Sequence, residues 1–118
     1  MEKFIAWVEI PASDFNRAVQ FYRQVFDLDM KTVEGGDEKM AFFPGGEGAI
    51  SLSPGFHPSR DGVLVSLHAR KGIDALLQQV TAHGGEIAKG KTKIEAEGRG
   101  YFALFIDSEG NKIGLYQD

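Results

Sequence analysis

The chain has 118 residues, with 13 Lys and Arg against 17 Asp and Glu, so its formal net charge is −4 and its length fits one compact domain. A composition of 42% hydrophobic and 25% charged residues is typical of a soluble globular protein, and the acidic balance argues against a nucleic-acid partner. Cysteine is absent, which excludes disulfides, thiolate nucleophiles and zinc–thiolate sites.

The first half of the chain predicts a strand, a helix and three further strands. Residues 4–10 alternate well enough for a strand that Pro11 ends. Asp14 or Ser13 is a good N-cap for a helix over residues 14–27. Its apolar residues recur at helical spacing: Phe15, Ala18, Val19, Tyr22, Val25 and Phe26. Glycine-rich turns separate the strand candidates that follow, at residues 29–34, 39–43 and 49–53.

The second half repeats this order after a break at residues 54–62. A strand over residues 63–68 precedes a helix that Gly84-Gly85 closes at its C-terminus. The apolar residues of this helix are Ile73, Leu76, Leu77 and Val80, and the last strands are expected at residues 86–89, 99–106 and 112–116. The pattern predicts an α+β fold with two βαβββ modules, residues 3–53 and 63–118, joined by the linker 54–62. We expect helices on the outer faces of mixed sheets that curl around a shared cleft.

Two separated motifs carry a resemblance to a known family. They are WVEIPASD at residues 7–14, followed by RAVQFY at residues 17–22, and GYFALFIDSEGNKIGL at residues 100–115. Together they resemble the vicinal oxygen chelate (VOC) superfamily, which contains glyoxalase I, bleomycin-resistance proteins and extradiol dioxygenases. Ser108 stands where the family's closing turn usually has a proline. The resemblance covers nearly the whole chain and implies paired βαβββ modules around a cleft.

The resemblance also implies where a divalent metal would bind. The family's ligand positions, one in the first strand and one in the last strand of each module, fall on Trp7, Ser51, Leu64 and Gly114. Indole and alkyl groups donate nothing, glycine has no side chain, and a neutral serine hydroxyl is a weak ligand. We therefore expect no metal and no other cofactor, and glyoxalase I or extradiol dioxygenase activity is disfavoured.

Strand alternation predicts which side chains line the cleft. In the first strand it places Phe4, Ala6, Val8 and Ile10 toward the helices and leaves Trp7 and Glu9 facing the cleft. The same parity, with the positions taken from the resemblance, adds Phe42, Ser51, Leu64, Ser66, His68, Phe102, Leu104, Gly114 and Tyr116. Such a mainly aromatic and aliphatic lining with a few polar groups is typical of a small-molecule site.

Glu9 is the candidate catalytic residue. A carboxylate on an apolar strand is unfavourable unless it is paired or solvated. Partial burial would favour its uptake of a proton and make Glu9 a possible general base. In the alternative interpretation Glu9 pairs with Lys112 or Arg99, or lies in water at the cleft mouth. Trp7 either stacks on a planar ligand or fills the space of the missing metal.

The sequence thus favours a metal-free member of the family that binds a small, partly aromatic molecule in the cleft between the modules. The alternative is a lyase, isomerase or dioxygenase-type enzyme, related to lactoylglutathione lyase, that uses Glu9 as base with an absent or non-standard metal. A third reading is an interaction module whose own side chains fill the cleft. No apolar stretch approaches the ~20 residues of a membrane span and no signal peptide is apparent, so we expect a cytoplasmic location and no membrane partner. Apolar strand edges predict a two-fold homodimer.

Overall fold

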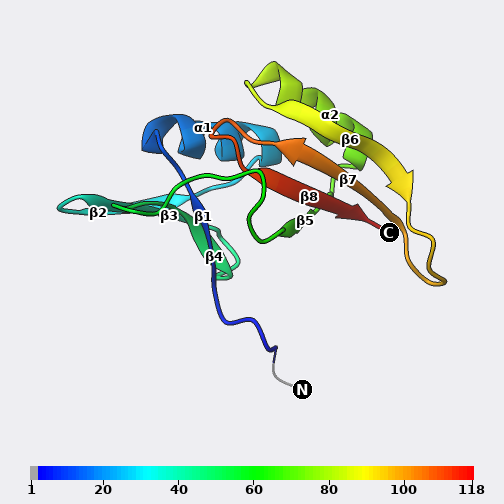
Figure 1. Ribbon diagram of the computed structural model, residues 1–118, viewed down its shortest axis with the longest axis horizontal. Helices are drawn as coiled ribbons and strands as arrows, with labels where there is room; N and C mark the ends of the chain where they lie inside the picture. Colours follow the sequence, from blue (N-terminus) through cyan, green and yellow to red (C-terminus); the bar gives the residue numbers. More distant parts are fainter. Residues whose placement is uncertain (1–2) are drawn as a thin grey trace.

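The computed structural model describes residues 3–118, and these form two βαβββ modules (Figure 1). The first module contains β1 (Val8–Pro11), α1 (Phe15–Phe26), β2 (Lys31–Gly35), β3 (Glu38–Phe42) and β4 (Gly48–Leu52). The second contains β5 (Ser66–His68), α2 (Ile73–Ala82), β6 (Glu86–Lys93), β7 (Tyr101–Ile106) and β8 (Lys112–Gln117). The predicted α+β class and the repeated order of elements are confirmed. No helix in residues 3–118 is long and apolar enough to cross a membrane.

The two modules build sheets of the same topology. Their strand orders are β1-β4-β3-β2 and β5-β8-β7-β6. In each sheet the first strand of the module runs parallel to the last, and the other pairs are antiparallel, so both sheets are mixed. Figure 1 shows both helices on one side of the sheets, with α1 over the middle of the molecule and α2 beside β6. The opposite sheet faces are therefore left without a helical cover.

The first helix begins and ends where local chemistry dictates. Asp14 has extended backbone angles, and its side chain accepts a hydrogen bond from the Arg17 N–H at 3.1 Å, so Asp14 is the N-cap. Asp27 ends the helix in the left-handed region, with φ of 55°, and its N–H donates to the Arg23 carbonyl. The predicted apolar stripe is buried except for Phe26, which is partly buried.

The second helix is capped from a distant strand. Gly72 at its N-cap offers no side chain, and the Ile73 N–H donates instead to the side-chain oxygen of Gln117 at 2.8 Å. At the other end Gly84 has a φ of 96°, which glycine adopts without steric strain, and the Gly85 N–H donates to the Val80 carbonyl at 2.8 Å. The predicted glycine stop is confirmed, and the four predicted apolar residues of α2 are buried.

One hydrophobic core serves both modules. The buried residues of α1, α2 and the helix-facing sides of both sheets belong to a single cluster. Phe21 and Phe26 of α1 each place their ring centroid 6.1 Å from that of Phe105, which lies on β7 of the second module. The first helix therefore packs against both sheets, and the modules are halves of one domain.

Two predicted strands, β1 and β5, begin three or four residues later than expected. The register of β1 with β4 starts at Val8 opposite Gly48, so residues 4–7 have no partner strand within their module. The assignment of Phe4 and Ala6 to the helix-packed side is wrong, since both are exposed, Phe4 by 98%. Likewise β5 begins at Ser66 instead of residue 63, and Val63 is 93% exposed. Alternating apolar and polar residues indicate a segment that can form a strand, but the strand extends only as far as a neighbouring strand is present to pair with it.

The sixth strand is longer than predicted. It runs over Glu86–Lys93 instead of residues 86–89, and it pairs with β7 through two register shifts. Near its end, Lys91 and Lys93 place their ammonium groups 4.7 and 5.5 Å from the ring centroid of Tyr101. The two register shifts interrupt the alternation of inward and outward side chains, which is the sequence pattern that would have predicted the full length of the strand.

Candidate ligand-binding site

The predicted cleft residues that lie within strands are on the open faces of the two sheets. Residues directly opposite one another in a sheet point to the same side. In the first sheet Ala49 pairs with Glu9 and Phe42, whereas the buried Ile50 pairs with Ile10 and Ala41. In the second sheet Gly114 lies between Ser66 and Leu104, and Tyr116 lies between His68 and Phe102. The helices pack against the other face of each sheet.

In the first module the open face carries an aromatic pair and a hydrogen-bonded carboxylate. The Trp7 ring is 41% exposed and meets Phe42 edge-on, with the centroids 6.1 Å apart. Glu9 is exposed and accepts a hydrogen bond of 2.7 Å from the hydroxyl of Ser51, which is buried. Glu9 belongs to none of the four ion pairs found in residues 3–118, so neither Lys112 nor Arg99 pairs with it.

In the second module the corresponding face has little free space at its centre. A Cβ atom on Gly114 would lie only 2.4 Å from the hydroxyl oxygen of Ser66, so the serine fills the position that a side chain would need. His68 is exposed and meets the Tyr116 ring edge-on at 6.4 Å. Leu64 lies before β5 and is 50% exposed, so the structure does not bring it onto the strand.

The residues at the family's metal positions do not fit a divalent ion. Among the four side chains at these positions only Ser51 carries an oxygen atom, and its hydroxyl donates a hydrogen bond to Glu9. Within residues 3–118 there is no group of three or more His, Cys, Asp or Glu side chains that could hold a metal. A catalytic zinc ion is typically held by about three protein ligands, and calcium takes about six to eight oxygen ligands. The side chains at these positions are therefore unable to hold a divalent metal.

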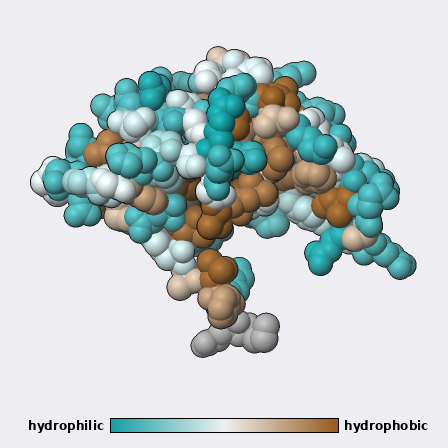
Figure 2. Space-filling model, in the orientation of Figure 1, coloured by the Kyte–Doolittle hydropathy of each residue, from teal (hydrophilic) through white to brown (hydrophobic). Residues whose placement is uncertain are grey.

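A pocket of about 740 Å³ lies where the two modules meet, and we call it the seam pocket. It opens between the C-terminal end of α1, the β3–β4 turn, β5 and the start of α2. Its lining residues are Val8, Tyr22, Phe26, Asp27, Leu28, Phe43, Pro44, Gly45, Glu47, Val65, Ser66, Leu67, His68, Arg70, Lys71 and Leu76. Figure 2 shows hydrophobic surface gathered between β4 and β5 and continuing onto the N-terminal segment.

The seam pocket overlaps only slightly with the predicted cleft. Of the predicted lining, Ser66 and His68 contribute to the pocket, whereas Phe26, Phe43 and Arg70 were missed. Parity arguments apply within strands, but this pocket is built mainly from element ends and turns. A large apolar residue immediately before a turn, as Phe43 stands before Pro44-Gly45, is the sequence signal that could have found it.

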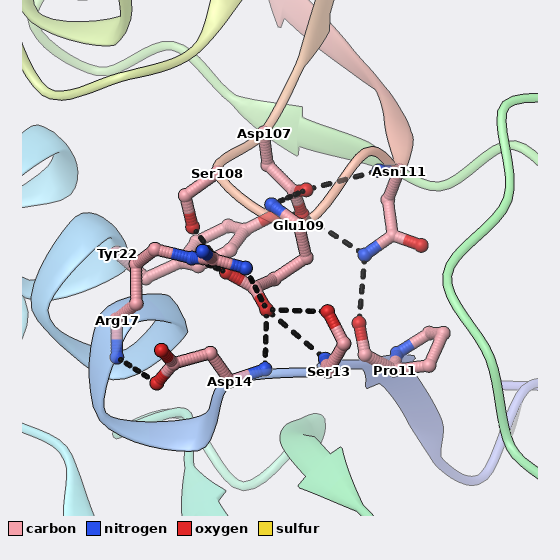
Figure 3. A network of polar contacts seen from close by, with 9 residues as sticks. All are labelled: Pro11, Ser13, Asp14, Arg17, Tyr22, Asp107, Ser108, Glu109 and Asn111. Carbon is pink, nitrogen blue, oxygen red and sulfur yellow. Dashed lines mark hydrogen bonds and ion pairs between the residues drawn. The ribbon is translucent and has the colours of Figure 1, made fainter.

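A polar network beside the pocket ties the two modules together (Figure 3). Its centre is Glu109 in the β7–β8 turn, whose side chain is only 1% exposed. The carboxylate accepts hydrogen bonds from the backbone N–H groups of Ser13 and Asp14 at 3.0 and 2.7 Å and from Arg17 Nε at 2.7 Å. Burial raises the pKa of Glu109, but hydrogen bonds from Arg17, the Asp14 backbone and Ser108 outweigh it and lower the pKa to about 2.

The second part of the network is buried beneath α1. The Tyr22 hydroxyl donates to Asp107 at 2.7 Å, and Asn111 donates from its side chain to Asp107 at 3.1 Å and to the Pro11 carbonyl at 2.8 Å. Burial raises the pKa of Tyr22 well above its ordinary value, and the nearby Asp107 acts in the same direction. The phenol therefore stays protonated and serves as a donor, and the network positions elements without offering a reactive group.

Two mixed sheets of order 1-4-3-2, each covered by one helix and related by repetition, define the class of paired βαβββ proteins. The model of the Glyoxalase/Bleomycin resistance protein/Dioxygenase superfamily matches residues 4–115, and the chain belongs to this superfamily. The comparison with curated proteins found no match.

Solved structures share the fold at low sequence identity. A glyoxalase/bleomycin resistance protein from Albidiferax ferrireducens T118 is 17% identical with a TM-score of 0.71, and the match covers 98% of this chain and 100% of that one. A glyoxalase-related enzyme from Fulvimarina pelagi is 11% identical with a TM-score of 0.72, over 99% and 89%. TnmS3, an antibiotic binding protein from Streptomyces sp. CB03234, is 22% identical with a TM-score of 0.66, over 98% and 96%. These likenesses show the fold alone.

Proposed function

We propose that this protein binds a small, partly aromatic molecule in the seam pocket without the help of a metal. The observation that carries the proposal is the pocket of about 740 Å³ between the modules, with a lining that is mainly aromatic and aliphatic. Pockets of roughly 300 to 1,000 Å³ with few polar groups are those that take drug-sized ligands. The antibiotic-binding relative from Streptomyces supports the same kind of role.

The walls of the pocket favour a ligand with a flat apolar body. Phe26 and Phe43 each lie within about 6.4 Å of the Tyr22 ring, so the three rings form one aromatic surface at the pocket. Aromatic partners gain from offset or edge contact beyond the burial of area, by about 0.5–1.5 kcal/mol for each pair. Glu9 does not line the seam pocket, so the proposal assigns it no catalytic role. The cytoplasmic location and the lack of a nucleic-acid partner stay predictions of the sequence.

A library of small aromatic compounds tests this proposal, with the change in melting temperature on adding each compound as the readout. We expect at least one compound to raise the melting temperature, and the Val65→Phe variant to weaken its binding about tenfold by filling the pocket. The control is Val63→Phe, because Val63 is 93% exposed and does not line the pocket.

Treatment with EDTA separates the metal-free proposal from a metal-dependent one. Binding should be unchanged after chelation, and metal analysis should find no stoichiometric divalent ion. A library without a single stabilising compound, or binding that disappears with EDTA, would contradict the proposed function.

We also propose that the protein forms a homodimer through its exposed apolar segments. Phe4, Ile5 and Trp7 are 98%, 64% and 41% exposed, and they continue into β1, the edge strand of its sheet. Val63 and Leu64 stand in the equivalent place before β5, the edge strand of the other sheet. Exposed apolar clusters next to open strand edges are typical of protein interfaces, and a second copy related by a two-fold axis would cover both.

Sedimentation velocity is expected to show a dimer of the 12.9 kDa chain, and Ile5→Asp should raise its dissociation constant at least about tenfold by burying a charge. Ile87→Asp is the matched control, because Ile87 has comparable exposure, 47%, but lies on β6 away from these segments. A wild-type protein that sediments as a monomer at micromolar concentration would refute the dimer.

A further inference from the structure

We propose that the ligand of the seam pocket carries an acidic group, a carboxylate or sulfonate, which Arg70 binds at the pocket mouth. This inference rests on the proposed function and specifies the chemical class of its ligand. It comes from the position of Arg70, the charges around it and the apolar walls behind it.

Arg70 is held at the pocket mouth by a rigid turn. The Gly72 N–H donates to the Ala69 carbonyl at 2.9 Å, which makes Arg70 and Lys71 the two central residues of a β-turn between β5 and α2. The turn is anchored on both sides, since the Ala69 N–H donates to the Tyr116 carbonyl and the Ile73 N–H donates to Gln117. Because the backbone of this turn is fixed, no loop has to become ordered when the guanidinium binds a ligand.

The ion pairs around the pocket leave the Arg70 guanidinium available. Lys71 forms an ion pair with Asp27, which lines the pocket from the first module, with the charged atoms 3.6 Å apart. Arg70 is exposed and takes part in none of the four ion pairs found in residues 3–118. A guanidinium at the edge of an apolar pocket is a preferred partner for a carboxylate, because its planar fork donates two parallel hydrogen bonds.

The charged residues on the two sides of the pocket favour one orientation of the bound molecule. Asp27 and Glu47 line the pocket from the first module, together with the C-terminal end of α1, which carries a partial negative charge. Arg70 and Lys71 line it from the second module, next to the start of α2. An acidic group is therefore favoured on the α2 side, while the apolar body extends toward Phe26 and Phe43.

Two fluorescent probes of nearly the same shape test this inference. 1-Anilinonaphthalene-8-sulfonate carries an acidic group, and N-phenyl-1-naphthylamine is the same aromatic body without it. We expect the purified wild-type protein to bind the sulfonate at least about fivefold more tightly, and Arg70→Gln to remove most of this difference while changing binding of the neutral probe less than about twofold. The advantage of the sulfonate should also decline as salt is raised, because the interaction lies near the surface.

Matched variants locate the binding and assign the charge effect. Arg99→Gln removes the same charge from an exposed residue outside the pocket and should leave both probes unaffected. Val65→Phe should weaken both probes together. Equal binding of the two probes by the wild type, or equal losses for both in Arg70→Gln, would overturn the acidic-ligand inference and leave the proposed function intact. Binding of the neutral probe that is absent, or that ignores Val65→Phe, would overturn the proposed function and this inference with it.

Discussion

Glu109→Ala is expected to lower the free energy of unfolding by about 2–3 kcal/mol and the melting temperature by roughly 10 °C. The reason is that the buried carboxylate accepts hydrogen bonds from two backbone N–H groups at the start of α1 and from Arg17. Alanine removes the shared acceptor of these donors, and with it the link between the start of α1 and the β7–β8 turn, although Ser13, Asp14 and Arg17 are themselves exposed. Urea unfolding followed by circular dichroism measures the loss.

The matched control for Glu109 is an ion pair at the surface. Glu34 lies 3.2 Å from Lys39, and both side chains are substantially exposed. Exposed pairs contribute little because water and salt screen them, so Glu34→Ala should change stability by less than about 0.5 kcal/mol. Equal effects of the two substitutions would show that the Glu109 network does not hold the modules together.

The Glu109 contribution depends on pH in a predictable direction. The pKa of Glu109 is about 2 in the folded protein, below its ordinary value of 4.5. A lowered folded pKa gives stability that is fully present above the unfolded pKa and is lost as the pH falls through the folded pKa. The wild type should therefore lose most of its stability advantage over Glu109→Gln as the pH falls from about 5 to about 2. A difference that stays constant over this range would contradict the assignment.

The fold could be predicted because the ends of its helices are determined by residues close to them in the sequence. Asp14 and Gly84 mark helix ends by hydrogen-bonding capacity and backbone freedom, and both act as predicted. The spacing of apolar residues along each helix also identified its buried side, because this spacing depends only on residues three or four positions apart. The starts of β1 and β5 could not be predicted, because residues 4–7 and 63–65 have strand-like sequences whose pairing depends on where distant strands begin.

The candidate site could be predicted only in part, since it depends on contacts between modules. Ser66 and His68 were identified from strand parity, and they line the seam pocket. Arg70 and Phe43 lie in turns, where no periodicity reports the direction of a side chain. The pairing of Arg17 with Glu109 joins residues 92 positions apart, and a single sequence contains no signal for it.

Phe105→Ala is expected to have the largest effect, a loss of about 3–5 kcal/mol in the free energy of unfolding. Phe105 is fully buried, and its ring lies between α1 of the first module and the sheet of the second, with Phe21 and Phe26 as its aromatic neighbours. Such a loss is a large fraction of the roughly 5–15 kcal/mol that stabilises a typical domain. Phe102→Ala is the control on the same strand, because Phe102 points away from the helices and is only partly buried, so its loss should be clearly smaller.

The way in which Phe105→Ala unfolds also tests whether the modules are one cooperative unit. Because the core is continuous across both modules, removing a ring from the second module should destabilise the first by the same amount. Trp7 fluorescence reports on the first module, and far-ultraviolet circular dichroism reports on both. The two urea transitions are expected to coincide and to move together in the variant. Separate midpoints would mean that each module is stable on its own, which would leave the seam pocket between two parts that can separate.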